Sequence, residues 1–150
     1  MPPSHQLVVF SLDEQRYALY LPAVQRVVRM IEITPLPKAP EIVLGVINVQ
    51  GQIVPVVDIR RRFRLPVRDL RLSDHLLIAH AAKRTVALVV DAVSSTVEHS
   101  AQAVIMAEEI LPGLAYVAGV IRLEDGLVLI HDLDTLLSLD EEHTLDDAMP

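Results

Sequence analysis

The chain has 150 residues, enough for one compact domain or for two small lobes that share a core. Apolar residues make up 51% and aromatic residues only 3%, so the core must be built from Val, Leu, Ile and Ala. The formal charge of −7 argues against nucleic acid or an anionic membrane surface as the main partner, and the absence of cysteine excludes disulfides and thiolate zinc sites.

Short strands separated by turns are predicted for the first half of the chain. Three prolines between residues 34 and 40 predict an extended loop, because proline donates no backbone hydrogen bond to a helix or sheet. Asp58 is placed to cap a short helix over residues 59–63. The predicted strands are residues 7–12, 16–21, 26–33, 43–49 and 52–57.

The second half repeats this arrangement after a polar linker over residues 64–73. Residues 100–115 are predicted to be irregular, and Asp132 is placed to cap a helix over residues 133–137. We expect residues 1–6 to be a flexible N-terminus and residues 139–150 an acidic tail, helical or frayed. The predicted strands are residues 76–81, 85–90, a weaker 96–99, 116–123 and 127–131.

An internal repeat relates the two halves. Gly45 and Gly119 open similar apolar hairpins 74 residues apart, and the same offset separates Asp58 from Asp132. The earlier hairpins align at an offset of 69, so that Ala18 falls on Ala87. We therefore predict two similar lobes, near residues 7–65 and 76–138, built as small barrels or a sandwich. The residues expected to be buried are Val46, Val54, Val56, Val89, Val120 and Leu129.

No phosphate loop, dinucleotide motif, zinc-protease motif or nucleophile elbow is present. His131 and Asp132 could form a metal corner or an acid–base pair, but a strand-end histidine beside a helix cap is the favoured interpretation. We expect no enzymatic activity, no cofactor and no metal. The alternative is a small β-barrel ligand-binding protein or hydrolase that uses a cleft between the lobes, with Asp58, His131 and Asp132 near its rim.

A run of basic residues lies between residues 60 and 71. It could suggest a nucleic-acid-binding barrel, but the aromatic stacking platforms that such a barrel uses are missing near it. A solvated helix face and linker, able to dock an acidic partner, is the favoured interpretation. The run comprises Arg60, Arg61, Arg62, Arg64, Arg68 and Arg71.

Three stretches carry a resemblance to a known family. They read YALYLPAVQRV over residues 17–27, ITPLPKAP over 33–40 and GVINVQGQIVPVVDIR over 45–60. The closing stretch GVIRLEDGLVLIHDLDTLL over residues 119–137 fits as well. Together they resemble the CheW-like family of chemotaxis coupling proteins over about residues 7–138.

The resemblance implies an all-β fold with short helical turns, in which two five-stranded, SH3-like barrels surround a shared hydrophobic core. It also implies an adaptor without catalytic activity. Such an adaptor bridges the cytoplasmic tip of a chemoreceptor (a methyl-accepting chemotaxis protein) and the regulatory domain of a CheA-type histidine kinase. The expected location is the cytoplasm, with recruitment to membrane-bound receptor arrays and no insertion into the membrane. This location fits Met1–Gln6, which lacks the pattern of a signal peptide.

Two positions depart from the family pattern in charge. Arg26 stands where the family often has Glu, and Gln50 stands where it often has Arg before the hairpin glycine. Both positions are implicated by the resemblance in receptor contact. The implied receptor-facing patch consists of Val24, Arg26, Val27, Asn48, Gln50 and Gly51.

Overall fold

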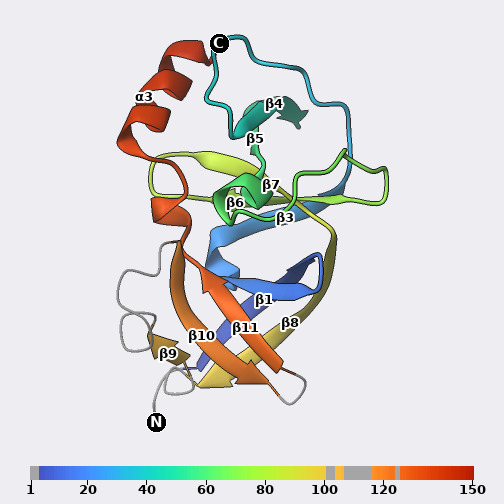
Figure 1. Cartoon of the computed structure of the whole chain (residues 1–150), viewed down its shortest axis with the longest axis vertical. Coiled ribbons are helices and arrows are strands. Elements are labelled where there is room, and N and C mark those ends of the chain that lie inside the picture. Colours follow the sequence, from blue (N-terminus) through green and yellow to red (C-terminus); the bar gives the residue numbers. More distant parts are fainter. Residues whose placement is uncertain (1–3, 101–103, 107–115, 124–125) are drawn as a thin grey trace.

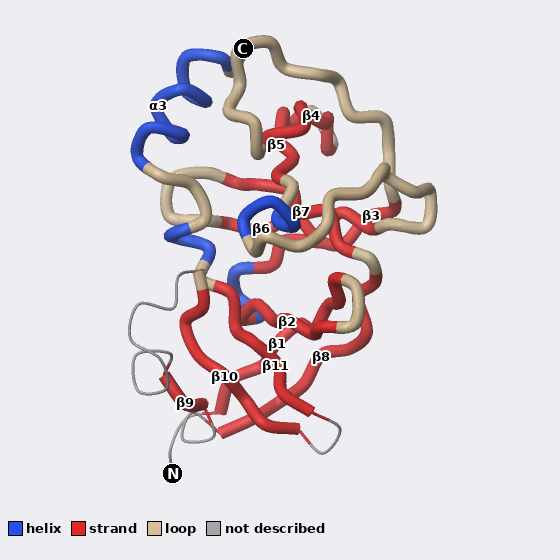
Figure 2. The backbone as a smooth tube through the Cα atoms, viewed as in Figure 1, coloured by secondary structure: helices blue, strands red, loops and turns tan. Residues whose placement is uncertain are grey.

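The structure of the chain is a computed structural model, and it is described for residues 4–100, 104–106, 116–123 and 126–150. Strands dominate, and the helices are short (Figures 1 and 2). No helix among these residues is long and apolar enough to cross a membrane. The elements are β1 (Ser4–Leu12), β2 (Gln15–Tyr20), η1 (Leu21–Ala23), β3 (Val24–Arg29), β4 (Val43–Val49), β5 (Gln52–Val57), α1 (Ile59–Arg62), β6 (His75–His80), β7 (Thr85–Val90), β8 (Ala92–Ser100), β9 (Val104–Met106), β10 (Val117–Leu123), β11 (Gly126–His131), η3 (Leu133–Thr135) and α3 (Leu139–Ala148).

The strands form two sheets that follow each other along the long axis of the molecule (Figure 1). The first sheet has the order β8-β1-β2-β11-β10-β9, and the second has the order β3-β6-β7-β5-β4. Among the described strands each sheet contains one parallel pair, β2 with β11 and β5 with β7. The other pairs are antiparallel, and four of them join strands connected by short turns.

The two sheets do not coincide with the two lobes expected near residues 7–65 and 76–138. The chain leaves the first sheet after β2, builds the whole second sheet between Val24 and Val90, and returns through β8. Each sheet therefore contains strands from both halves of the repeat. The reason is the parallel pairing, which joins the second strand of one half to the last strand of the other half and which local patterns do not specify.

The repeat itself is confirmed at the level of single residues. Val56 pairs with Ala87 in the second sheet, and the residues equivalent by the repeat, Ile130 and Ala18, pair in the first. Register shifts occur just before Gly45 and Gly119 in their hairpins. The side chains of Asp58 and Asp132 both accept a hydrogen bond from the backbone N–H two residues further on.

Neither sheet closes into a barrel among the described strands. In the second sheet β3 and β4 are opposite edges, and the edge of β4 is occupied by Thr34, which exchanges two backbone hydrogen bonds with Val46. Thr34 comes so close to β4 that a Cβ on Gly45 would lie 2.2 Å from its carbonyl oxygen. The proline-containing loop thus takes the position that β3 would need for closure. The two β lobes are confirmed, but as open sheets.

The largest cluster of buried side chains lies between the sheets. It includes Phe10 and Leu19 from the first sheet and Leu77 and Leu88 from the second, so the core is shared, as expected. Each sheet also has a smaller cluster of its own. Four of the six predicted core residues are buried, namely Val54, Val56, Val89 and Val120. Val46 and Leu129 are half-buried instead.

The acidic tail is an ordered helix, α3. Ser138 and Glu141 form a capping box, in which each side chain accepts a hydrogen bond from the backbone N–H of the other. The side chain of Leu145 is fully buried in the shared core. Two smaller differences concern strand ends, since β3 ends at Arg29 rather than at Ile33 and β8 is longer than predicted. The prediction that residues 100–115 are irregular is wrong for Ser100, which belongs to β8, and for residues 104–106, which form β9; the rest of that segment lies outside the described residues.

Candidate partner-binding surface

The turn between β4 and β5 presents half of the expected patch. Gln50 and Gly51 have φ angles of 51° and 87°, so both central residues of this two-residue hairpin are left-handed, as in a type I′ turn. The Oδ1 atom of Asn48 accepts a hydrogen bond of 2.8 Å from the backbone N–H of Gly51, which holds the turn in place. Asn48, Gln50 and Gly51 are all exposed.

The other half of the patch comes from β3. Val24 is half-buried and packs against the shared core. The ladder to β6 shifts between Val24 and Arg26, and from there on alternate side chains point to opposite faces. Val27, 39% exposed, therefore points to the face opposite Arg26. The six residues are neighbours in the fold but do not share one face.

A side-chain hydrogen bond joins the two halves. The guanidinium of Arg26 donates from Nη2 to Oε1 of Gln50 at 3.2 Å. The two residues singled out by the sequence analysis for their charge, Arg26 and Gln50, therefore contact each other. Because β3 and β4 are opposite edges of the sheet, this contact also crosses its open side.

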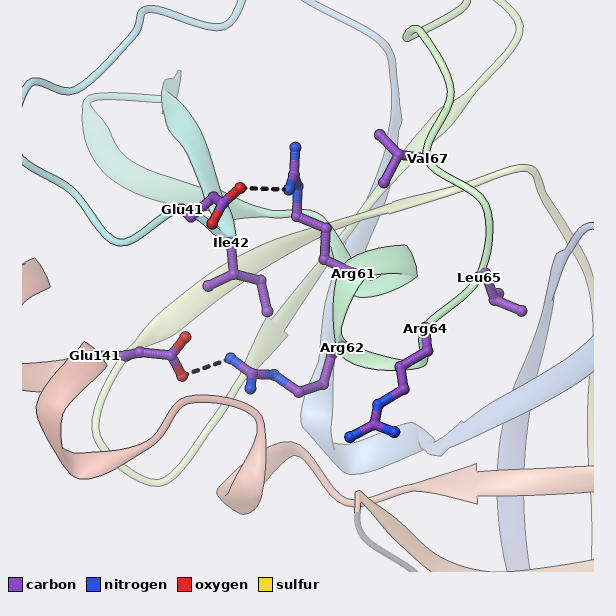
Figure 3. Close-up of a pocket in the computed structure, with 8 residues that line it drawn as sticks. All are labelled: Glu41, Ile42, Arg61, Arg62, Arg64, Leu65, Val67 and Glu141. Carbon is purple, nitrogen blue, oxygen red and sulfur yellow. Dashed lines mark hydrogen bonds and ion pairs between the residues drawn. The ribbon is translucent and has the colours of Figure 1, made fainter.

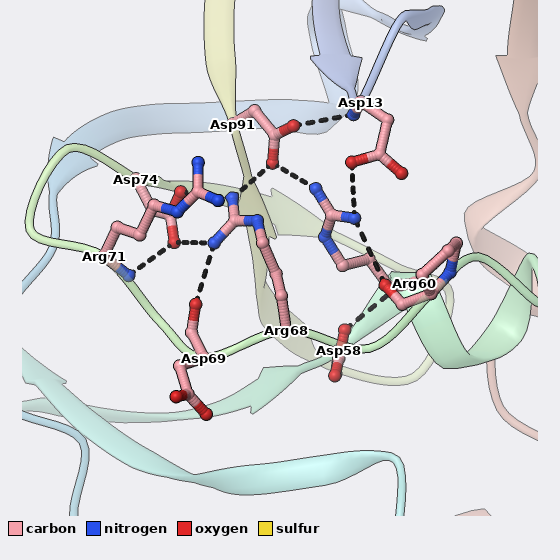
Figure 4. Close-up of polar contacts among 9 residues, drawn as sticks. Asp13, Asp58, Arg60, Arg68, Asp69, Arg71, Asp74 and Asp91 are labelled. Atoms are coloured by element: carbon pink, nitrogen blue, oxygen red, sulfur yellow. Dashed lines mark hydrogen bonds and ion pairs between the residues drawn. The ribbon is translucent and has the colours of Figure 1, made fainter.

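Most of the arginine run is engaged within the protein. Arg60 is only 5% exposed, and its guanidinium forms ion pairs with Asp13 at 2.8 Å and with Asp91 at 2.6 Å (Figure 4). Arg68 binds Asp91 and Asp74, each at 2.6 Å. The interpretation of the run as a solvated face is therefore wrong for Arg60 and Arg68. These arginines tie the β1–β2 turn, the linker and the start of β8 together.

Hydrogen bonding also sets the charge state of this cluster. Burial alone would raise the pKa of Asp74, but the hydrogen bonds from Arg68 and from the backbone N–H of Arg71 outweigh it and lower that pKa. Burial acts against ionisation of Asp91 as well, and the bonds from Arg60, the Asp13 backbone and Arg68 again lower the pKa. Both carboxylates stay ionised at neutral pH.

The residues considered for catalysis, Asp58, His131 and Asp132, have structural roles in the fold. Asp58 and Asp132 cap α1 and η3. His131 is buried beside Phe63, with ring centroids 5.0 Å apart, and burial lowers its pKa to about 4. Neither of its ring nitrogens has a hydrogen-bond partner among the described residues. His131 and Asp132 line a pocket of about 370 Å³ together with Tyr20. Across the described part of the chain, no three His, Cys, Asp or Glu side chains are grouped as metal ligands.

Comparison with known proteins decides the family. The model of the CheW-like domain matches residues 6–141. The chain belongs to the CheW-like domain family. The chemotaxis protein CheW of Rhizobium meliloti (strain 1021) is 28% identical over 138 residues, which cover 91% of this chain and 89% of that protein. The chemotaxis protein CheW of Treponema pallidum (strain Nichols) is 26% identical over 142 residues, with 91% and 84% covered.

A solved structure confirms the fold of this CheW-like chain. The scaffolding protein TtCheW from Thermoanaerobacter tengcongensis superposes with a TM-score of 0.83 at 30% identity, and the match covers 94% of this chain and 96% of that one. The resemblance drawn from the sequence motifs is thereby confirmed.

One exposed apolar residue next to the patch was missed from the sequence. Ile53 is 40% exposed and lies opposite Asn48 in the β4–β5 ladder. It belongs to the apolar run of β5, which suggested a buried strand. The pairing register of the hairpin was the signal that could have placed it beside the turn, away from the core.

A second hollow lies beside α1 and the N-terminal part of α3 (Figure 3). It has a volume of about 430 Å³ and brings together Arg61, Arg62 and Arg64. Arg61 pairs with Glu41 at 2.9 Å, and Arg62 pairs with Glu141 of α3. The guanidinium of Arg62 also lies over the ring of Tyr116, 5.2 Å from its centroid. This hollow therefore already binds carboxylates of the chain itself.

Proposed function

We propose that this chain is a non-enzymatic adaptor that couples chemoreceptors to a CheA-type histidine kinase. The observation that carries the proposal is the match to the CheW-like domain over residues 6–141, together with relatives that are named chemotaxis protein CheW. The similar solved structure is of a scaffolding protein. The surroundings of Asp58 and Asp132, which cap helices, agree with a binding role.

The adaptor would act in the cytoplasm at receptor arrays, where both of its proposed partners are accessible. Its receptor-facing patch would be Val24, Arg26, Val27, Asn48, Gln50 and Gly51, with Ile53 as an addition. Within this patch, the exposed turn would supply backbone and amide groups and Ile53 apolar area. Arg26 would supply a cation that a carboxylate or a backbone carbonyl of the receptor tip can accept.

A reconstitution tests the proposal. The kinase and the cytoplasmic fragment of a chemoreceptor, both from the genome that encodes this chain, are mixed with and without it, and kinase autophosphorylation is followed. We expect the chain to bind each partner separately and to make kinase activity depend on the receptor fragment. If it binds neither partner, the proposal fails.

A further inference from the structure

The C-terminal helix α3 is held on the second lobe by one buried leucine and by a set of ion pairs. Arg62 of α1 pairs with Glu141 at 2.5 Å. Arg84, in the turn between β6 and β7, pairs with Glu142 at 2.8 Å and also with Asp146. All three carboxylates belong to α3, and both arginines belong to the surface beneath it, which we call the α3 seat.

The apolar part of the contact is small. Leu145 is the only residue of α3 that is fully buried, while Leu139 is 71% exposed. The helix has ten residues, and an isolated helix of that length is marginal in water. Its order therefore depends on the seat rather than on its own helical tendency.

The α3 helix does not fill the space next to the α3 seat. The hollow of about 430 Å³ in Figure 3 lies beside Glu141. Another hollow, of about 360 Å³, lies beside Glu142 and Leu139. Well-packed interfaces leave few such spaces. Arg64 borders the first hollow and Lys83 the second. Within the described part of the chain neither side chain forms a hydrogen bond or a close ion pair, and Lys83 acts on Asp146 only through its charge, so both can accept additional carboxylates.

We propose that the α3 seat is a docking surface for an acidic helix of a partner protein, and that α3 occupies it as an internal competitor. The partner is specified by what α3 presents, which is two adjacent carboxylates followed by a leucine and a further carboxylate, as in Glu141, Glu142, Leu145 and Asp146. A longer helix would also reach Arg64 and Lys83 and fill the two hollows. This advantage would let it displace α3 despite the high effective concentration of a tethered segment. The inference does not depend on the receptor-facing patch, which uses other residues.

A labelled peptide with the sequence of residues 138–150 tests this proposal in the full chain, with binding followed by fluorescence anisotropy. In the variant E142Q/D146N the chain's own helix loses its contacts to Arg84. The matched control D140N/D147N removes two exposed carboxylates of α3 that form no ion pair with any described residue. We expect E142Q/D146N to bind the peptide about three- to tenfold more tightly than wild type, because apparent affinity scales with the fraction of open seats. D140N/D147N should bind it like wild type.

Adding R84Q to E142Q/D146N should abolish the gain, because the seat then lacks its main cation. Equal peptide affinity in wild type, E142Q/D146N and D140N/D147N would overturn the proposal. So would a wild-type dimer in light scattering that dissociates in E142Q/D146N, since α3 would then be exchanged between two copies. Circular dichroism checks folding, and if E142Q/D146N has lost its strand signal, the single variant E142Q replaces it in the same comparison.

Discussion

Arg26 on β3 and Gln50 on the β4–β5 turn form a hydrogen bond across the open side of the second sheet. Two edges that share no backbone pairing are thus linked by two side chains of the expected receptor-facing patch. A receptor that binds here meets a cation and an amide that are already oriented toward each other.

Reversing the charge of Arg26 should weaken receptor binding selectively. In R26E the contact to Gln50 is lost and a carboxylate faces the receptor tip. The loss should be about 2–5 kcal/mol if the contact is desolvated, and well under that at an exposed rim. Receptor and kinase affinities are measured on one preparation. Kinase affinity should change little, because we expect the kinase to dock on a separate surface.

The matched control is R29E, which reverses an exposed charge on the same strand. It should leave receptor affinity near that of wild type. Equal losses toward receptor and kinase in R26E would point to misfolding or to a shared site. Unchanged receptor binding would mean that the receptor contacts another part of the chain.

Truncating Val56 should destabilise the second lobe. Val56 is fully buried and pairs with Ala87 across the parallel contact. V56A should lower the free energy of unfolding by about 1–3 kcal/mol through lost burial and a cavity. Urea denaturation measures the change, with V27A as the control at a partly exposed position of β3. Equal midpoints for V56A and wild type would contradict the assigned burial.

Two glycines should respond differently to alanine. At Gly45 a Cβ would lie 2.2 Å from the Thr34 carbonyl oxygen, so G45A must push the proline-containing loop off β4. At Gly51 there is open space, and only the φ of 87° disfavours a side chain. We expect G51A to cost about 1–2 kcal/mol and G45A clearly more. Thermal or urea unfolding of both variants checks the order, which fails if G51A is the more damaging change.

Replacing His131 should reduce the loss of folding stability in acid. Burial lowers its folded-state pKa to about 4, well below its unfolded value, so the unfolded chain binds the extra proton first as the pH falls. Stability should thus decline from about pH 6.5 to pH 4, by roughly 3 kcal/mol for a shift of this size. H131V introduces the residue type found at the repeat-equivalent Val57 and should flatten this decline. The exposed residue His143 gives the control H143Q, which should retain it.

The ion cluster around Arg68 should affect folding stability at a lower pH than His131 does. The folded-state pKa values of Asp74 and Asp91 are lowered, so their stabilising effect is complete above the unfolded value and is lost as the pH falls through the folded one. D74N should reduce stability at pH 7, because it leaves Arg68 without its buried partner, and it should reduce the slope below about pH 4. Unfolding curves between pH 2 and 7 measure both effects. An unchanged slope would contradict the assigned role of Asp74.

Local features of the fold could be predicted from the sequence, and long-range ones could not. The repeat correctly paired Gly45 with Gly119 and Asp58 with Asp132, because turns and caps depend on a few adjacent residues. The exchange of strands between the sheets depends on parallel pairs between distant segments, for which no local signal exists. The burial of Arg60 was missed for a similar reason, since its partners Asp13 and Asp91 lie far away in the sequence.

The candidate patch shows the same difference between local features, which the sequence predicts, and long-range features, which it does not. The turn at Gln50 and Gly51 lies where the sequence predicts it, because two apolar runs are separated there by two residues that include a glycine. The shift in the β3 ladder, which turns Val27 away from Arg26, is set by the pairing with β6 and leaves no trace in the spacing of β3 itself.

The exchange of strands also sets an order in which the protein can form as it leaves the ribosome. The second sheet needs only Val24 to Val90, whereas in the first sheet β2 must wait for β11, because Ala18 pairs with Ile130. Until that strand emerges, β1 and β2 are without this neighbour. The strand pairing of the lobe with the proposed receptor-facing patch can therefore be complete before the N-terminal hairpin finds its final place and closes the shared core.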